Sequence, residues 1–360
     1  RKWASGTQRS VFSSHLVICN LFAKSVAYST LLEILPVVFV SDKRYNAFTR
    51  NKQPELHNKI VTQLQEKVKE AAFLKNIFGN HLPKEDHKAE TKEFTTLSNG
   101  IQMPMIGLGV MHMHGNECVR AICEAVDAGY RMIDTAAIYG NEAAVGKGIR
   151  DSGIDREKLF ITTKLWVQDA DERHAKAAYE QSLRNLGLEY VDLFLIHQPL
   201  GDIYGAWRVM EKLYEEGKVR AIGVSNLNSG RLVDLSMHNR ITPHVNQVEI
   251  HPFYSQEKAV QEMKNLGVQP EGWAPFAEGR NNIFRDKVLT DIGQKYGKTP
   301  AQVILRWNIE RGVAVVPKSS KPSRIRENYD VWDFRLTKDD MTAIQKMEGG
   351  RELFFEHDSP

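Results

Sequence analysis

The chain has 360 residues, of which 42% are hydrophobic and 26% charged, and a formal net charge of +3. These values are typical of a globular protein, and the interspersed basic and acidic residues argue against a nucleic-acid partner. The three cysteines, Cys19, Cys118 and Cys123, form neither a CxxC pair nor a zinc spacing, so we expect no metal site. Such cysteine usage suits a reducing compartment, which favours a cytoplasmic location.

Residues 15–40 are rich in apolar side chains but do not predict a membrane span. Lys24, Glu33 and Pro36 interrupt them, so no uncharged run of about 18 residues exists. Glu33 also lies inside what would be the apolar core of a secretory signal peptide, and no small-residue cleavage motif follows. We therefore expect no membrane partner.

Residues 1–91 form an N-terminal extension to which we assign no function. The chain begins with Arg, which indicates a fragment or a translation that starts upstream of the true start. Within the extension, apolar residues recur every fourth position among Lys, Glu and Gln. This pattern predicts an amphipathic helix over about 55–78.

Residues 92–360 alternate short β-rich apolar runs with amphipathic stretches. They open with FTTLSNGIQMPM (94–105), in which Asn99-Gly100 predicts a β-hairpin. Strand candidates follow at 105–110, 131–134, 159–164, 191–197, 221–225, 245–250, 268–274 and 313–317, and helical patterns lie between them, including 117–128, 171–186, 206–216 and 301–310. Eight strands alternating with helices predict an α/β fold, a (β/α)8 TIM barrel rather than a doubly wound sheet. The third glycine of the dinucleotide fingerprint is absent after Gly107-Leu108-Gly109.

Four polar residues follow three consecutive strand candidates. Asp134, Lys164 and His197 stand at the ends of the second, third and fourth candidates, and Tyr139 lies in the loop after Asp134. In a barrel of this kind the reactive groups follow the C-terminal ends of the strands. We therefore expect the four side chains to converge on one mouth of the barrel.

These four residue types can act together as a proton donor. A tyrosine phenol titrates near ~10, too high for an efficient donor at neutral pH, and an adjacent Lys164 ammonium would lower the pKa of Tyr139. Asp134 would keep Lys164 charged, and His197 would bind the substrate oxygen. Taken alone, Asp134 is more simply a helix cap and His197 an interior histidine, but their joint occurrence favours catalysis.

Segments of the chain resemble the signature segments of the aldo-keto reductase family. They are DTAAIYGNE (134–142), ITTKLW (161–166), LIHQP (195–199), GVSN (223–226), NQVEIHP (246–252), WAPFAEG (273–279) and VPKSSKPSRIRENYDVWDF (316–334), and the resemblance spans residues 94–360. It implies an NADPH-dependent oxidoreductase that reduces aldehydes or ketones to alcohols. The catalytic residues that it implies are Asp134, Tyr139, Lys164 and His197, with Tyr139 as the proton donor.

The same resemblance implies the residues that bind the nicotinamide end of the cofactor. Ser225, Asn226 and Gln247 match positions that hold the nicotinamide carboxamide. Trp273 stands where the family usually has a ring that stacks on the nicotinamide, and tryptophan keeps that flat surface.

The resemblance also implies a pocket for the adenosine 2′-phosphate. Lys318, Ser319 and Arg324 match that pocket, and Glu327 and Asn328 match residues at the adenine. Two cations and a hydroxyl within seven residues can bind a dianionic phosphate, which favours NADPH over NADH. The alternative for this segment is a solvated basic turn before a helix.

The substrate is less closely indicated. WAPFAEGRNNIF (273–284) and the short ending ELFFEHDSP (352–360) most resemble the branch of bacterial 2,5-diketo-D-gluconic acid reductases and prostaglandin F synthases. The short ending implies an open pocket. Met111 replaces an aromatic residue that is common after the first strand, and we expect Trp166 to remain as a pocket wall. Keto sugar acids, such as 2,5-diketo-D-gluconate, and small reactive aldehydes stay open as substrates.

Two other functions are weighed against this one. Lys164, His197 and His251, with the histidines of HMH (112–114), could hold zinc in a metal-dependent hydrolase barrel, but segment 313–320 lacks the carboxylate that such enzymes need. A non-catalytic nicotinamide-binding regulatory subunit is the other alternative, although a binder needs no proton donor. Because a barrel of about 270 residues buries a large core, we expect a monomer.

Overall fold

The computed structural model of the chain describes residues 93–350 and 352–354. The amphipathic helix expected over about 55–78 lies outside the described residues. Within them, no helix is long and apolar enough to cross a membrane.

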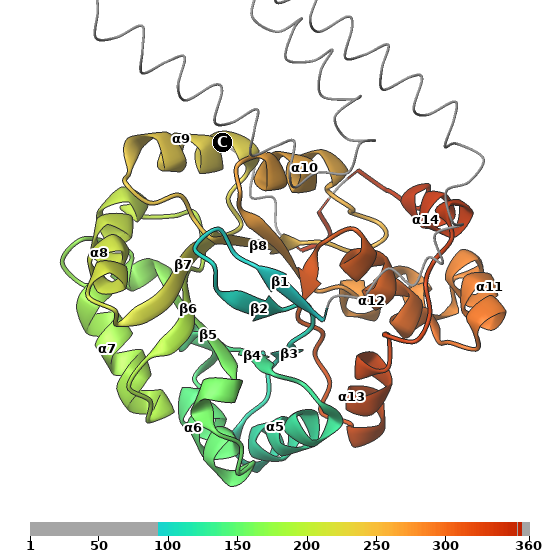
Figure 1. Cartoon of the computed structure of the whole chain (residues 1–360), viewed down its shortest axis with the longest axis horizontal. Helices are drawn as coiled ribbons and strands as arrows, with labels where there is room; N and C mark the ends of the chain where they lie inside the picture. Colours follow the sequence, from blue (N-terminus) through green and yellow to red (C-terminus); the bar gives the residue numbers. More distant parts are fainter. Residues whose placement is uncertain (1–92, 351, 355–360) are drawn as a thin grey trace, which may run out of the picture. The chain divides into compact units, whose positions relative to one another are not determined.

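Eight parallel strands form the centre of the described chain (Figure 1). They are β3 (Leu108–Gly109), β4 (Met132–Asp134), β5 (Phe160–Leu165), β6 (Val191–Ile196), β7 (Val219–Ser225), β8 (Val245–Glu249), β9 (Gln269–Trp273) and β10 (Ala314–Val315). Each strand pairs with its neighbour in the sequence, so the order in the sheet is the order in the chain. All eight strand candidates correspond to these strands, and the predicted (β/α)8 TIM barrel is confirmed.

The barrel closes where its first strand meets its last. Ile106 and Val315 form a parallel bridge, and the backbone N–H of Gly109 donates to the carbonyl oxygen of Pro317 at 3.0 Å. A Cβ at Gly109 would lie only 2.8 Å from the carbonyl oxygen of Val316. Glycine is therefore required at this position, because the two backbones meet there.

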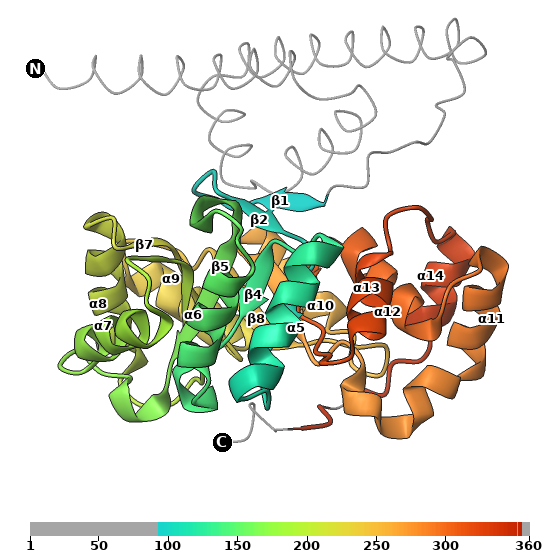
Figure 2. The same cartoon turned by 90° about the horizontal axis from the view of Figure 1, so that it is seen from below.

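A short hairpin precedes the barrel, as predicted. Strands β1 (Phe94–Thr96) and β2 (Gln102–Pro104) pair antiparallel, and Gly100 takes the positive φ of 87° that the turn requires. The hydroxyl of Thr95 donates to Oε1 of Gln269, at the start of β9, at 3.0 Å. The hairpin thus covers the end of the barrel at which the strands begin (Figure 2).

The strands alternate with helices that form the outer ring of the barrel (Figure 1). The helices are α5 (Gly115–Ala128), α6 (Glu142–Asp151), α7 (Ala175–Leu186), α8 (Ile203–Glu215), α9 (Ser229–His238), α10 (Glu257–Asn265), α11 (Lys287–Tyr296), α12 (Pro300–Glu310), α13 (Pro322–Tyr329) and α14 (Lys338–Gln345), with short 3-10 helices η1 (Ala137–Tyr139), η2 (Arg156–Lys158), η3 (Val167–Asp169) and η4 (Ala277–Arg285). Local chemistry sets their ends: α12 begins at a capping box made by Thr299 and Gln302, with Pro300 in its first turn.

Strand β6 is apolar at five of its six positions because both of its faces are buried. All six residues of β6 are buried, since side chains fill the barrel and helices cover its outside. The one charged residue of β6, Asp192, pairs with Arg156 at 2.6 Å and with Arg220 at 2.5 Å. Two guanidinium groups thus compensate this buried carboxylate at the strand-start end of the barrel, away from the strand exits.

Replacing Gly109 with alanine should weaken the closure of the barrel. We expect Gly109→Ala to lower the free energy of unfolding by about 1–3 kcal/mol, because the new methyl group meets backbone that cannot rotate away. Gly230→Ala is the control, since Gly230 lies exposed in α9 and its Cβ would touch only Asn228 Oδ1 at 3.7 Å. Urea denaturation should leave this control as stable as the parent or slightly more stable. If Gly109→Ala were as stable as the parent, the closure of the barrel would not require glycine at this position.

Candidate active site

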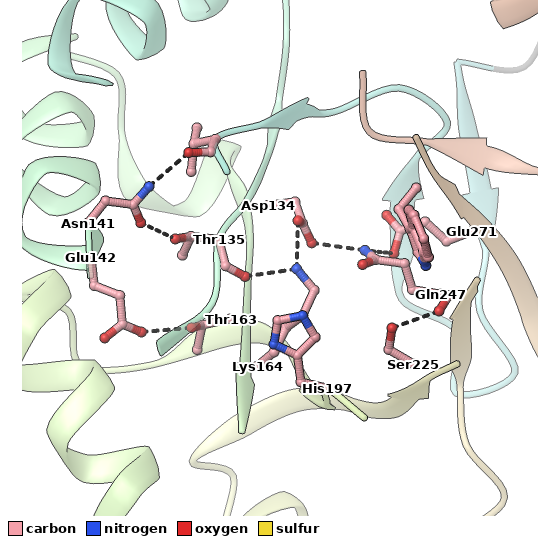
Figure 3. Close-up of polar contacts among 12 residues, drawn as sticks. Asp134, Thr135, Asn141, Glu142, Thr163, Lys164, His197, Ser225, Gln247 and Glu271 are labelled. Atoms are coloured by element: carbon pink, nitrogen blue, oxygen red, sulfur yellow. Dashed lines mark hydrogen bonds and ion pairs between the residues drawn. The ribbon is translucent and has the colours of Figure 1, made fainter. Parts of the chain in front are cut away.

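The ends of β4, β5 and β6 bring three of the predicted catalytic side chains together (Figure 3). Asp134 is the last residue of β4, Lys164 is the last but one of β5, and His197 directly follows β6. Tyr139, which ends η1 in the loop after β4, completes the group. The expected convergence of the four side chains on one mouth of the barrel is what the structure shows.

Lys164 lies at the centre of this group and is fully buried. Its ammonium donates to Asp134 Oδ1 at 2.6 Å and to the carbonyl oxygen of Thr135 at 3.0 Å. Burial alone would lower the pKa of Lys164, but the neighbouring Asp134 and Tyr139 outweigh it and hold the pKa above its ordinary value. The side chain is therefore a permanent cation at neutral pH.

Tyr139 lies against this cation. The ammonium of Lys164 is 5.2 Å from the centre of the Tyr139 ring. The charge of Lys164 lowers the pKa of Tyr139, as expected from the sequence, but burial acts more strongly in the opposite direction and Asp134 adds to it. The net pKa of Tyr139 is raised above its ordinary value, so the expectation of a lowered pKa was wrong for the protein without ligands. Its hydroxyl is protonated at neutral pH.

His197 packs between two aromatic rings. Its ring centre lies 5.7 Å from that of Tyr139 and 5.2 Å from that of Trp166, edge to face in both cases. Burial first, and then the charge of Lys164, lower the pKa of His197 to about 3. Its Nδ1 is buried and has no partner among the described residues. The imidazole is therefore neutral at physiological pH.

The predicted nicotinamide-binding residues lie beside the catalytic group. The Ser225 hydroxyl donates to the carbonyl oxygen of Gln247 at 2.7 Å, and Trp273 Nε1 donates to Asn226 Oδ1 at 2.8 Å. Gln247 Nε2 in turn donates to Asp134 Oδ2 at 2.9 Å. The exits of β7, β8 and β9 are thus connected by hydrogen bonds to the ion pair at the exits of β4 and β5.

The predicted phosphate pocket lies around the start of α13. Lys318 and Arg324 are exposed, whereas Ser319 and Asn328 are buried. In the described residues neither Lys318 nor Arg324 forms an ion pair, unlike Arg326 of the same helix, which pairs with Glu124 at 2.6 Å.

Glu327 differs from its predicted neighbours in this pocket. One oxygen of its carboxylate already accepts a hydrogen bond from the Thr299 hydroxyl at 2.7 Å. Glu327 therefore ties α13 to the start of α12.

Asn141 fixes the loop that carries Met111. Its Nδ2 donates to the carbonyl oxygens of Val110 and Met113 at 2.8 and 3.0 Å, and its Oδ1 accepts from the Thr135 hydroxyl at 2.7 Å. Met111 itself is half-buried. The predicted pocket wall is thus held against the loop that leads to Tyr139, a role of Asn141 that the sequence analysis missed.

Two further features of the site were not predicted. Glu271 of β9 is fully buried beside Gln247, and the sequence carries no signal that marks this carboxyl group as part of the site. The ring of Phe354, near the end of the chain, lies 5.5 Å from that of Trp273. Phe354 therefore packs against the side chain that is predicted to stack on the nicotinamide.

The residues considered for a zinc site do not come together as ligands. In residues 93–350 and 352–354, no three His, Cys, Asp or Glu side chains are grouped as a metal ion requires. His251 Nε2 instead lies 2.9 Å from Glu249 Oε1, and both side chains are buried.

Comparison with known proteins gives the same picture as the geometry. The model of the Aldo/keto reductase family matches residues 105–348. The glyoxal reductase of Bacillus subtilis (strain 168) is 47% identical over 258 residues, which cover 71% of this chain and 93% of that protein. The methylglyoxal reductase DkgA of Escherichia coli (strain K12) is 44% identical over 260 residues, which cover 71% of this chain and 94% of that protein.

A solved structure extends the comparison to the fold. The crystal structure of a Bombyx mori aldo-keto reductase in complex with NADP is 33% identical, with a TM-score of 0.70 over 74% of this chain and 95% of that one. Sequence and fold therefore agree along the whole barrel. The chain belongs to the aldo/keto reductase family and is an oxidoreductase that acts on carbonyl compounds.

Proposed function

We propose that this enzyme uses NADPH to reduce aldehydes or ketones to alcohols, with Tyr139 as the proton donor. The observation that carries the proposal is the buried ammonium of Lys164, which lies 2.6 Å from Asp134 and against the ring of Tyr139. The catalytic unit is assigned to residues 92–360, and the partner is a small carbonyl substrate.

The protonation states suit this reaction. When bound, the cofactor supplies the hydride that adds to the carbonyl carbon. The Tyr139 hydroxyl, which is protonated at neutral pH, gives its proton to the carbonyl oxygen, and a phenolate remains. Lys164 stabilises that phenolate as it forms, so the interaction is strongest in the transition state.

His197 positions the substrate. Because its imidazole is neutral, one ring nitrogen carries a proton that it can donate to the carbonyl oxygen. A charged imidazolium beside Lys164 would add a second buried cation, which the depressed pKa of His197 excludes at neutral pH. His197 thus orients the oxygen toward Tyr139 and does not compete as the acid.

The residues present fit NADPH. At the nicotinamide end, Gln247 Oε1 accepts no hydrogen bond from the described residues, so it is open to the carboxamide, which Ser225 and Asn226 would also hold. Trp273 would stack on the nicotinamide ring. Lys318 and Arg324, which form no ion pair with the described residues, would bind the 2′-phosphate together with the Ser319 hydroxyl, and Glu327 and Asn328 would bind the adenine.

Small reactive dicarbonyl compounds are the substrates that the relatives favour. Two similar proteins are named glyoxal reductase and methylglyoxal reductase. Met111 and Trp166 would form walls of the pocket, and the flexible thioether of Met111 suits substrates of differing shape. Keto sugar acids, such as 2,5-diketo-D-gluconate, are the alternative class of substrate.

Tyr139→Phe should strongly reduce turnover but leave cofactor binding intact. Loss of the proton donor should reduce kcat by about 10²–10⁴-fold, whereas the Kd for NADPH should stay within about twofold, because the hydroxyl faces the substrate. Turnover of methylglyoxal is followed by NADPH absorbance and binding by calorimetry. Tyr204→Phe is the control, since Tyr204 bonds Asp234 on α9. A Tyr139→Phe enzyme that keeps parental turnover would refute the role.

Arg324→Ala should weaken NADPH selectively. We expect the Kd for NADPH to rise about tenfold or more through the loss of a charge-assisted hydrogen bond, while the Kd for NADH, which lacks the 2′-phosphate, should not change. Arg326→Ala removes the same charge from the same helix, and its guanidinium is already paired with Glu124. If both variants raised the Kd values for NADPH and NADH equally, Arg324 would not belong to a pocket for the 2′-phosphate.

The depressed pKa of His197 should also appear in protein stability. Between pH 6.5 and about 3, His197 is protonated in the unfolded chain but neutral in the folded protein. His197 therefore contributes to the free energy of unfolding at neutral pH, and this contribution is lost as the pH falls. Urea denaturation at pH 7 and pH 5 should show a steeper loss for the parent than for His197→Asn, by at most about 1.4 kcal/mol per pH unit. If the free energy of unfolding fell equally in the parent and in His197→Asn, His197 would not be neutral in the folded protein.

A further inference from the structure

Glu271 is a buried carboxyl group that the proposed mechanism does not use. It lies in β9 with no exposed surface. Its Oε2 accepts a hydrogen bond from Gln247 Nε2 at 2.9 Å, and its Oε1 is buried without a partner among the described residues. Burial, and then the charge of Asp134, raise the pKa of Glu271 to about 8, against the opposing effects of Gln247 and Lys164.

A buried, incompletely bonded carboxyl group is costly, and an apolar residue at this position would avoid that cost. Groups of this kind are retained where they serve a site. Among the described residues, Glu271 accepts one hydrogen bond, and its donor is Gln247. The role of Glu271 should therefore be sought in what it does to Gln247.

The amide of Gln247 lies between two carboxyl groups. Its Nε2 carries two hydrogens, and these reach Asp134 Oδ2 and Glu271 Oε2, both at 2.9 Å (Figure 3). Gln247 and Glu271 are direct neighbours in the ladder between β8 and β9. With both hydrogens of Nε2 engaged, Gln247 Oε1 is turned away from the two carboxyl groups.

The reverse orientation of this amide would be unfavourable. It would set Gln247 Oε1 against the carboxylate of Asp134, acceptor against acceptor, and would present Nε2 where a carboxamide amine must bind. Asp134 alone can hold only one hydrogen of Nε2 in this geometry, since its Oδ1 is already bonded to Lys164. The second hydrogen depends on Glu271.

We propose that Glu271 is a positioning residue that fixes the Gln247 amide so that its oxygen accepts the amine of the nicotinamide carboxamide. This inference rests on the proposed use of NADPH. Glu271 acts through Gln247 and does not touch the cofactor itself. Its effect is therefore confined to recognition of the nicotinamide carboxamide.

The test compares two cofactors on matched variants. The probes are NADPH and its acetylpyridine analogue, in which a methyl group replaces the carboxamide amine, and Kd values are measured by calorimetry on the full chain. Glu271→Met keeps the length of the side chain but offers only a weakly accepting thioether, and Glu271→Gln keeps a strong acceptor. Glu211→Gln is the control, because Glu211 is also buried but bonds the backbone of Arg240 and Ile241 after α9.

The parent should bind NADPH about fivefold more tightly than the analogue, the value of one neutral hydrogen bond. Glu271→Met should lose this preference, whereas Glu271→Gln and Glu211→Gln should keep it. Binding of 2′,5′-ADP, which has no nicotinamide, should be equal in all of them. If Glu271→Met does not fold, Glu271→Asp serves instead, since its shorter side chain withdraws the acceptor from Gln247 and should also lose the preference.

Three results would overturn the inference, and they separate it from the proposed function. If Glu271→Met and Glu271→Asp both kept the parent's preference for NADPH over the analogue, Glu271 would have no positioning role. Equal loss in Glu271→Gln and Glu271→Met would show that the acid proton matters rather than the acceptor. A parent that binds both cofactors equally would exclude the carboxamide contact yet leave NADPH-dependent reduction intact, whereas a parent that binds no NADPH would refute the proposed function itself.

Discussion

A buried ion pair between two neighbouring strands sets the chemistry of this barrel. Lys164 and Asp134 lie 2.6 Å apart with almost no exposure, and in such surroundings each charge is tolerated because the other is present. The cation faces Tyr139, and the anion faces the amide of Gln247. The side of the mouth that is proposed to donate the proton and the side proposed to hold the cofactor therefore depend on the same interaction.

Exclusion of water then fixes the remaining protonation states. Burial raises the pKa of Tyr139 and lowers that of His197, so both side chains are neutral near pH 7. Lys164 experiences the same burial but keeps its charge, because Asp134 is bonded to it. One packed environment thus yields two neutral hydrogen-bond donors and one fixed cation, an arrangement that suits charge developing on a carbonyl oxygen.

The barrel and the placement of its catalytic group could be predicted from the sequence, because Asp134 and His197 directly end apolar runs whose order defines the strands. The sign of the pKa shift of Tyr139 could not be predicted, since it depends on how completely packing removes water from the ring. Glu271 was missed for a related reason: within QPEGW (269–273) nothing in the letters distinguishes a carboxyl group inside the barrel from one in solvent. The predicted cofactor contacts came from the resemblance to the aldo-keto reductase family, because no local pattern other than the basic residues at 318–324 indicates a nucleotide.

The seam that closes the barrel also links two ends of the proposed reaction site. The chain that leaves β3 leads to Met111, the chain that leaves β10 leads to Lys318, and one hydrogen bond from Gly109 to Pro317 joins them. Two further backbone hydrogen bonds continue this seam, from Gly107 to the carbonyl oxygen of Val315 at 2.9 Å and from Val315 to the carbonyl oxygen of Met105 at 3.0 Å. The segment proposed to bind the nucleotide and the segment proposed to line the substrate pocket thus leave the barrel from one shared seam.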